Sequence, residues 1–168
     1  MIAHFLGFVI IPALIAAAGF CDLTRYTIPN SIPAAVTLAF LGFAALSELS
    51  WLGLGVHVAT GLVALSVGFV MFSLRWIGGG DAKLFAATAL IFGPQLTFDY
   101  TLLAAIFGGA MAVTLLCMRQ LPLPAPLTTQ GWLVRLHDAR EGIPYGVALA
   151  LAALVIIFRS AIFNFVSS

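Results

Sequence analysis

Long apolar runs separated by short polar segments fill most of this sequence and leave it few ways to fold. Hydrophobic residues make up 62% of its 168 residues and charged residues only 8%. A globular domain averages about 45–50% apolar and about 25% charged residues. So little polar surface cannot cover a water-soluble particle. The composition therefore predicts an all-α membrane protein, and the net charge of +1 gives no sign of a nucleic-acid partner.

The apolar runs set the expected number of membrane crossings. A helix needs about 20 residues to cross the bilayer core. We expect one integral-membrane domain over residues 1–168, with six transmembrane helices at about 2–20, 32–47, 54–74, 84–98, 100–118 and 145–165. In this division Asp99 separates the fourth span from the fifth.

One longer polar region, residues 119–143, lies between the fifth and sixth spans. Prolines at its start forbid a regular helix there. From Thr128 to Glu141 the apolar and charged residues fall on different sides of a helix, which predicts a short amphipathic helix on the membrane surface. A disordered loop is the alternative.

The distribution of basic residues predicts the orientation. Cytoplasmic loops of membrane proteins carry an excess of Lys and Arg. With an external N-terminus, the loops of the inner side hold six basic residues and the outer side holds Arg159 alone; the six are Arg25, Arg75, Lys83, Arg119, Arg135 and Arg140. We therefore expect both termini outside and the region around residues 119–143 in the cytoplasm.

Two aspartates are expected at the same membrane face. Asp22 follows the first span and Asp81 follows the third, so two crossings separate them, whereas Asp99 falls on the opposite face. Two carboxyl groups a few ångströms apart share one proton. The ionised group can take a proton from water while the protonated group donates to a substrate carbonyl. Asp22 and Asp81 are thus a candidate catalytic dyad; structural ion pairs with Arg25 and Lys83 are the alternative.

The residues around Asp81 are candidates for substrate binding. Gly78, Gly79 and Gly80 lack side chains, so a substrate backbone can come close to Asp81; an ordinary flexible loop is the alternative. Lys83 either helps to hold Asp81 ionised or extends to the lipid headgroups. We also consider that Tyr145 hydrogen-bonds near the site or serves as an interfacial aromatic residue.

Three motifs together resemble one known family. Gly78-Gly79-Gly80-Asp81 matches a GxGD pattern, Ile28-Pro29-Asn30 follows Asp22, and Ile143-Pro144-Tyr145-Gly146 opens the last span. The order and placement of these motifs resemble those of type IV prepilin peptidases, which are GxGD intramembrane aspartic proteases. The likeness is greatest to the short, peptidase-only form of Flp/Tad pilus systems.

This resemblance implies a function for the whole chain. Asp22 and Asp81 would be the catalytic aspartates of an endopeptidase in the bacterial inner membrane that cleaves the leader of an Flp-like prepilin at the cytoplasmic face. The expected partners are the prepilin, membrane lipid and the pilus assembly machinery. No metal or other cofactor is implied. Larger members carry paired cysteines in an N-terminal extension and also methylate the new pilin terminus; the sequence has no CxxC pair, so methyltransferase activity is not expected.

Two other classes of protein compete with a peptidase. A small proton- or ion-coupled transporter would use the same acids near the middle of the bilayer, in a broken helix. A non-enzymatic component of a pilus or secretion assembly would tolerate Asp→Asn changes at positions 22 and 81. The expected position of both aspartates at span ends favours the peptidase over the transporter.

Overall fold

The computed structural model describes residues 2–47, 49–124 and 129–166, with side chains through residue 160. Every regular element in this part of the chain is helical. In order these are α1 (Ile2–Phe5), the π-helical turn η1 (Leu6–Ile10), α2 (Ile11–Arg25), α3 (Ser31–Leu46), α4 (Trp51–Ser73), α5 (Gly79–Met118), α6 (Gly131–His137) and α7 (Tyr145–Val166). The all-α prediction is confirmed.

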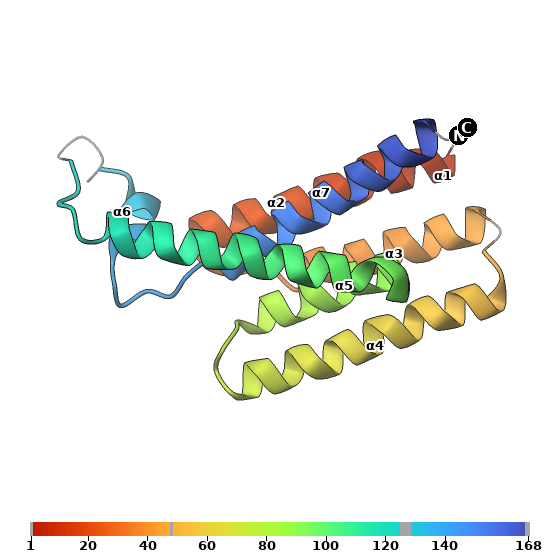
Figure 1. The fold of residues 1–168 in the computed structure, drawn as a ribbon, viewed down its shortest axis with the longest axis horizontal. Helices are drawn as coiled ribbons and strands as arrows, with labels where there is room; N and C mark the ends of the chain where they lie inside the picture. Colours follow the sequence, from red (N-terminus) through yellow and green to blue (C-terminus); the bar gives the residue numbers. More distant parts are fainter. Residues whose placement is uncertain (1, 48, 125–128, 167–168) are drawn as a thin grey trace.

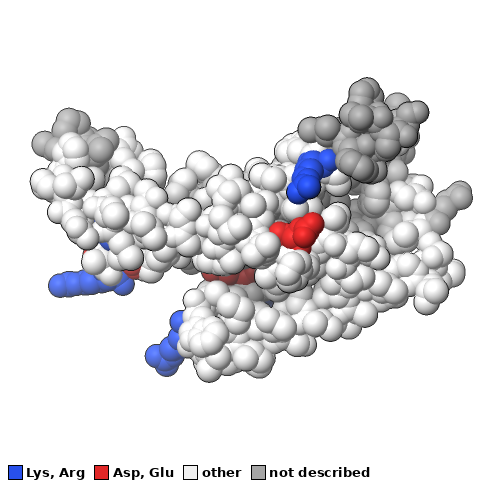
Figure 2. Space-filling view, in the orientation of Figure 1, with Lys and Arg blue, Asp and Glu red and all other residues white. Residues whose placement is uncertain are grey.

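Three helical stretches are long and apolar enough to cross a bilayer: Ile2–Arg25, Trp51–Ser73 and Gly79–Met118. Two shorter apolar helices, Ser31–Leu46 and Tyr145–Ser160, lie beside them. Many large apolar side chains point outward from these helices, and Figure 2 shows an outer surface almost free of charge. Such a surface is stable in lipid and not in water. The chain is an integral membrane protein.

Helix α5 is bent back on itself at Gly93. This residue has φ 61° and ψ −174°, a conformation open to glycine and strained for other residues, and Pro94 starts the second arm. The Tyr100 hydroxyl lies 2.8 Å from Thr88 Oγ1, which donates to it. Residues 12 apart in a straight helix would be about 18 Å apart. The two arms therefore form an antiparallel hairpin, as Figure 1 shows.

The structure corrects the expected boundary between the fourth and fifth spans. We placed it at Asp99, because a charged residue usually ends an apolar run. Asp99 instead lies inside the second arm of α5, and the reversal occurs six residues earlier, at Gly93. A backbone conformation that favours glycine, followed by a proline, decides the turn, while one exposed carboxylate does not interrupt a helix. The first arm, residues 79–92, is only about 21 Å long.

The hairpin brings most of the polar connections to one end of the molecule, while the connection between α3 and α4 lies at the other end. The ends of α2 and α4, both the beginning and the end of α5, α6 and the start of α7 lie toward the left of Figure 1. The two termini and the Gly93 turn lie toward the right. Of the predicted amphipathic helix, Thr128–Glu141, the structure forms only α6, Gly131–His137, because residues 129–130 and 138–141 are not helical; residues 125–128 lie outside the described part.

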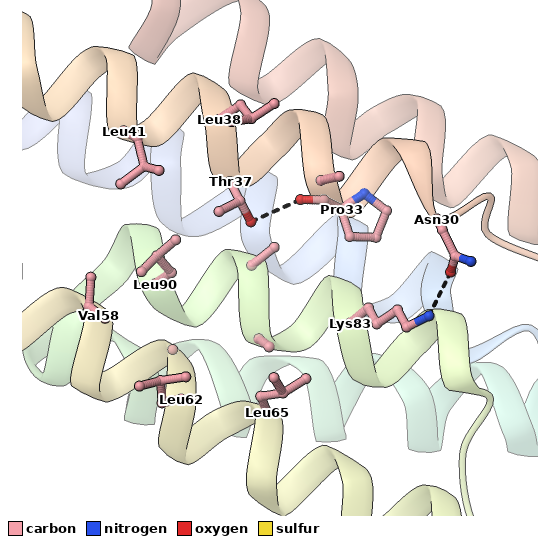
Figure 3. A pocket seen from close by; sticks show the side chains of 14 residues that line it. Asn30, Pro33, Thr37, Leu38, Leu41, Val58, Leu62, Leu65, Lys83 and Leu90 are labelled. Atoms are coloured by element: carbon pink, nitrogen blue, oxygen red, sulfur yellow. Dashed lines mark hydrogen bonds between the residues drawn. The ribbon is translucent and has the colours of Figure 1, made fainter.

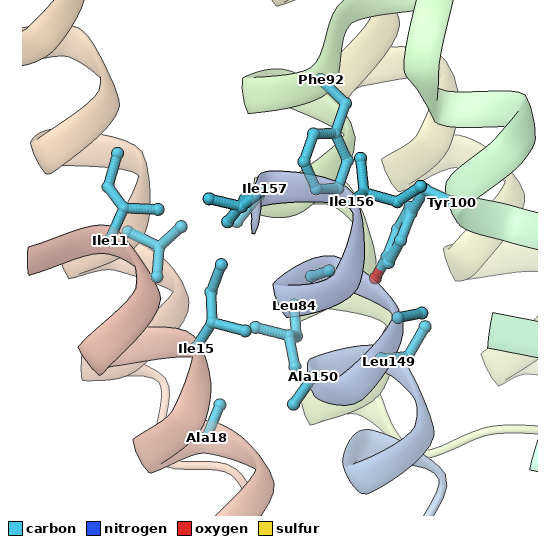
Figure 4. Packing of buried hydrophobic residues seen from close by; sticks show 14 of the residues in the cluster. Ile11, Ile15, Ala18, Leu84, Phe92, Tyr100, Leu149, Ala150, Ile156 and Ile157 are labelled. Atoms are coloured by element: carbon cyan, nitrogen blue, oxygen red, sulfur yellow. The ribbon is translucent and has the colours of Figure 1, made fainter. Parts of the chain in front are cut away.

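The core lies where α2, α3, α5 and α7 meet. In Figure 4, Ile11, Ile15 and Ala18 of α2 lie on one side of α7, and Leu149 lies on the other side of α7, toward Tyr100 of α5. Small residues let the backbones approach: a Cβ atom on Gly19 would lie 2.8 Å from Ala150 Cβ. Close contact between small residues is the usual basis of helix association in membranes.

Candidate active site

Asp22 lies in the last turn of α2, where we had expected a loop. The expected span stopped at residue 20, but α2 continues to Arg25 and ends because Tyr26 adopts a left-handed conformation, φ 56°. The Tyr26 N–H donates to the Asp22 carbonyl at 2.8 Å, which closes the helix. The Asp22 side chain points into the protein and is only 4% exposed.

Asp81 is the third residue of α5 and caps the start of that helix. Gly78 is the N-cap residue, and its N–H donates to Asp81 Oδ2 at 3.1 Å. This is one half of a capping box, in which a side chain at the third position returns to the N-cap backbone. A carboxylate there also interacts favourably with the helix dipole. Asp81 is 8% exposed.

The two aspartates line one small cavity. Its volume is about 180 Å³, and its walls are Asp22, Tyr26, Thr27, Ile28, Gly78, Gly79, Gly80 and Asp81. The charges of the two carboxylates interact electrostatically. Gly80 packs against Ile28, since a Cβ atom on Gly80 would lie 3.0 Å from Ile28 Cβ. The close contact between these two segments brings the end of α2 to the beginning of α5.

The first turn of α7 forms the back of the site. A Cβ atom on Gly146 would lie 2.8 Å from Asp22 Oδ2 and 2.6 Å from Ile28 Cδ1. The backbone N–H groups of Gly146 and Val147 face the Asp22 carboxylate. Oδ2 itself is buried and makes no hydrogen bond within 3.5 Å. The start of a helix, with its free N–H groups, is a suitable neighbour for a carboxylate.

The segment after α5 lies at the end of the molecule that holds the two aspartates. Arg119 donates from Nε to the Leu136 carbonyl and from a terminal nitrogen to the Gly142 carbonyl, both at 3.0 Å. Its guanidinium also faces the hydroxyl of Tyr26, whose buried oxygen lacks a hydrogen bond of standard geometry. Burial raises the pKa of the Tyr26 phenol, and the charge of Arg119 opposes that rise. Arg119 thus attaches residues 136–142 beside the cavity.

Not all the expected site residues meet there. Asp22, Asp81 and the three glycines line the cavity. Lys83 turns away and donates from Nζ to Asn30 Oδ1 at 2.7 Å. The Tyr145 ring packs over Gly108 in the second arm of α5, and its hydroxyl donates to the Ala104 carbonyl at 3.4 Å. Their expected roles in substrate binding stay predictions.

Sequence reasoning missed four contributors to the site. Tyr26, Thr27 and Ile28 lie between the first two expected spans and were given no role in the site, yet they form one wall. Gly146 was treated only as part of a helix start. The available signal was the motif at residues 143–146, in which a proline just before the helix marks its first turn and a glycine in that turn allows another segment to approach closely. Within the described residues, no three His, Cys, Asp or Glu side chains come together as metal ligands.

Comparisons with known proteins give one family. The Type IV leader peptidase family matches residues 8–113, more than half of the chain and both aspartates. A curated relative, the prepilin leader peptidase/N-methyltransferase of Bacillus subtilis (strain 168), is 28% identical over 153 residues, covering 85% of this chain. The aligned chain spans 60% of the length of that relative. No solved structure matches the chain.

Proposed function

Because the chain belongs to the Type IV leader peptidase family, we propose that Asp22 and Asp81 are its catalytic dyad. In this proposal the protein is an aspartic endopeptidase that removes the leader of a membrane-anchored, Flp-like prepilin. The observation that carries the proposal is the shared cavity of about 180 Å³, into which the end of α2 and the start of α5 each place one buried carboxylate.

The dyad would work as an acid–base pair. The ionised carboxylate takes a proton from water, and the hydroxide attacks the carbonyl carbon of the scissile peptide bond. The protonated carboxyl donates its proton to the carbonyl oxygen. As the tetrahedral diol intermediate collapses, the C–N bond breaks, the leaving amine takes the proton that the first carboxylate removed from water, and one hydroxyl group returns a proton to the other carboxylate, which restores the dyad. The apparent titration values belong to the pair, so neither residue is assigned one role.

The surroundings of the dyad suit this chemistry. Gly78, Gly79 and Gly80 line the cavity without side chains, which leaves room for an extended peptide backbone next to Asp81. The first turn of α7 holds Asp22 from behind. Burial of both carboxylates limits competition from bulk water and fixes their orientation before the substrate arrives.

The dyad is proposed to face the cytoplasm, in the bacterial inner membrane. The connections that carry six of the seven basic residues lie at the same end of the molecule as the dyad, and the termini lie at the other. An excess of Lys and Arg marks cytoplasmic loops. The proposed partners are the prepilin, the surrounding lipid and the pilus assembly machinery.

The decisive experiment replaces each aspartate by asparagine and measures processing of a co-expressed prepilin. Asp22→Asn and Asp81→Asn should each abolish leader removal while the protein still inserts into the membrane. Asp99→Asn is the matched control, because Asp99 is an exposed acid of the same helix as Asp81 that does not line the cavity. Normal processing by both variants would refute the dyad.

Sequencing the product N-terminus would locate the cleaved bond. Methyl transfer is not part of the proposal. The mass of the first residue of the product shows directly whether that residue carries a methyl group. The same variants separate the competing classes: ion flux lost on either substitution would indicate a carrier, and full function of both variants would indicate an assembly component.

A further inference from the structure

An apolar groove lies beside the first arm of α5, between α3 and α4. Its volume is about 790 Å³ and it is open along one side. Figure 3 shows Leu38 and Leu41 of α3 on one wall, and Val58, Leu62 and Leu65 of α4 on the other. Both walls belong to apolar helices in the membrane.

The floor of the groove is made of small residues. Ala34, Gly61, Ala86 and Ala87 line it, so an apolar helix lying there would come close to the backbones of α3, α4 and α5. Such close approach is how helices associate in lipid. The hydroxyl of Thr37 also lines the groove but donates to the Pro33 carbonyl at 3.0 Å, so it needs no partner from an occupant.

One end of the groove carries a positive charge that has no acidic partner among the residues the structure describes. The Lys83 ammonium is exposed, and the partner that it contacts is the neutral amide oxygen of Asn30, at 2.7 Å. Within the part of the chain that the structure describes, the groove lining contains no acid. An ammonium at the edge of an apolar groove favours an occupant that brings a negative charge.

The same end of the groove adjoins the catalytic cavity. Lys83 follows Asp81 by two residues, a rise of about 3 Å along α5, and Asn30 follows Ile28 by two residues. Asp81 and Ile28 line the catalytic cavity, whereas Lys83 and Asn30 line the groove. A chain lying in the groove and continuing past Lys83 therefore arrives at Gly78–Gly80 and the two carboxylates.

From these observations we propose that the groove binds the apolar helix of the peptide substrate, and that Lys83 pairs with an acidic side chain near the start of that helix. The inference rests on the proposed function. A lipid acyl chain would fit the apolar walls as well. It would not account for a groove whose charged end leads to the dyad. A peptide helix accounts for the walls, the charge and the continuity together.

Photocrosslinking tests where the substrate helix lies. The probe is a synthetic peptide with a polar leader ending in glycine, one glutamate and about 20 Leu, Ala and Val residues, reconstituted with the Asp81→Asn protein in phospholipid vesicles. Photoreactive p-benzoylphenylalanine replaces Leu38 in the groove or, as control, Phe20 on α2. These side chains are 68% and 67% exposed, so both are equally open to lipid. Crosslinks to the peptide should form at position 38 and not at position 20.

Filling the groove tests its importance for turnover. Ala34→Phe places a ring in the groove at an exposed position, and Ala17→Phe makes the same change on the exposed face of α2. We expect Ala34→Phe to raise KM for the peptide about tenfold, equivalent to about 1.4 kcal/mol, with Ala17→Phe unchanged. Equal KM values for both variants would overturn the proposal.

Removing the charge from Lys83, from the peptide, or from both tests whether Lys83 pairs with the peptide. Lys83→Met should weaken binding of the glutamate peptide about fivefold, about 1 kcal/mol, but should leave binding of the same peptide with glutamine unchanged. Such non-additivity identifies a direct pair. Equal losses for both peptides would exclude the pairing, and Lys83→Arg should restore most of the affinity.

The outcomes of these experiments test the proposed groove and the proposed catalytic dyad independently. Crosslinks at position 38 without any cleavage by the wild-type protein would support the groove and refute the peptidase. Cleavage with crosslinks at position 20 alone would support the peptidase and refute the groove. If the mass spectrum of the purified protein shows a phospholipid that Ala34→Phe displaces while the peptide crosslinks are unchanged, the groove is a lipid site and the proposal fails.

Discussion

Helices α7 and α4 are both apolar and similar in length, but the protein holds them in different ways. α7 packs against α2 and α5 and contributes Leu149, Ala150 and Ile156 to the core. α4 packs extensively against α5 only, and the residues it buries are Gly61, Ala64 and Gly68. Hydropathy alone would not separate the two helices.

The difference matches the two roles proposed for these sides of the molecule. On the α7 side, Gly146 packs directly behind the Asp22 carboxylate and leaves no space for a side chain between them. The α4 side leaves an open groove of about 790 Å³ between α3 and α4. A catalytic carboxylate benefits from rigid surroundings, whereas a site for a membrane helix needs an accessible surface. The following predictions test this contrast.

The largest effect is expected from adding one methyl group behind Asp22. Gly146→Ala places a Cβ atom 2.8 Å from Asp22 Oδ2, so the carboxylate must shift, and a displacement of about 1 Å can reduce kcat about a hundredfold. Gly109→Ala makes the same change where nothing lies within 4 Å. Cleavage rates of the two variants test the prediction. If they fall equally, α7 does not position Asp22.

The next effect concerns stability on the α7 side. A Cβ atom on Gly108 would overlap the Tyr145 ring. Gly108→Ala should therefore reduce the free energy of unfolding by about 1–3 kcal/mol, measured by thermal unfolding in detergent. Tyr145→Ala should remove the overlap, so the double variant should be more stable than the sum of the two changes predicts. Strict additivity would show that the two residues do not meet.

On the α4 side, the main polar contact is at the Gly93 turn. The His57 ring stacks on Phe40 with centroids 5.3 Å apart, and its Nδ1–H donates to the Leu90 carbonyl at 2.8 Å. His57→Phe keeps an aromatic ring but leaves that carbonyl without its donor, which should cost about 1–2 kcal/mol. His4→Phe, where the ring stacks on Phe8, is the control. Equal melting temperatures would show that the hydrogen bond contributes nothing.

The smallest effect should be local to the loop beside the cavity. Arg119→Lys loses the two-armed contact with the Leu136 and Gly142 carbonyls, because an ammonium cannot reproduce the guanidinium geometry. We expect faster protease cleavage within residues 129–144, with the melting temperature nearly unchanged. Arg75→Lys, at an exposed turn, serves as the reference. Unchanged cleavage would mean that Arg119 does not attach the loop.

Sequence reasoning predicted the fold class and placed the two aspartates at one end of the protein. It could do so because the lengths of the apolar runs, and the even number of membrane crossings between the two aspartates, can be counted in the sequence. It misplaced the boundary at Asp99, because hydropathy is insensitive to the single backbone conformation at Gly93 that reverses α5. It could not show where the side chain of Lys83 points, which the structure places against Asn30; the predicted role of Lys83 in substrate binding stays a prediction.

The sequence by itself determined that the chain is helical, lies in a membrane and carries two acids after its first and third apolar runs, because composition and spacing leave few alternatives. Only the tertiary structure decided that Ile28 and Gly80 touch, that Gly146 lies against Asp22, and that α4 borders an open groove. Those contacts join residues far apart in the chain, and close packing of small side chains between helices determines them, which no local pattern records.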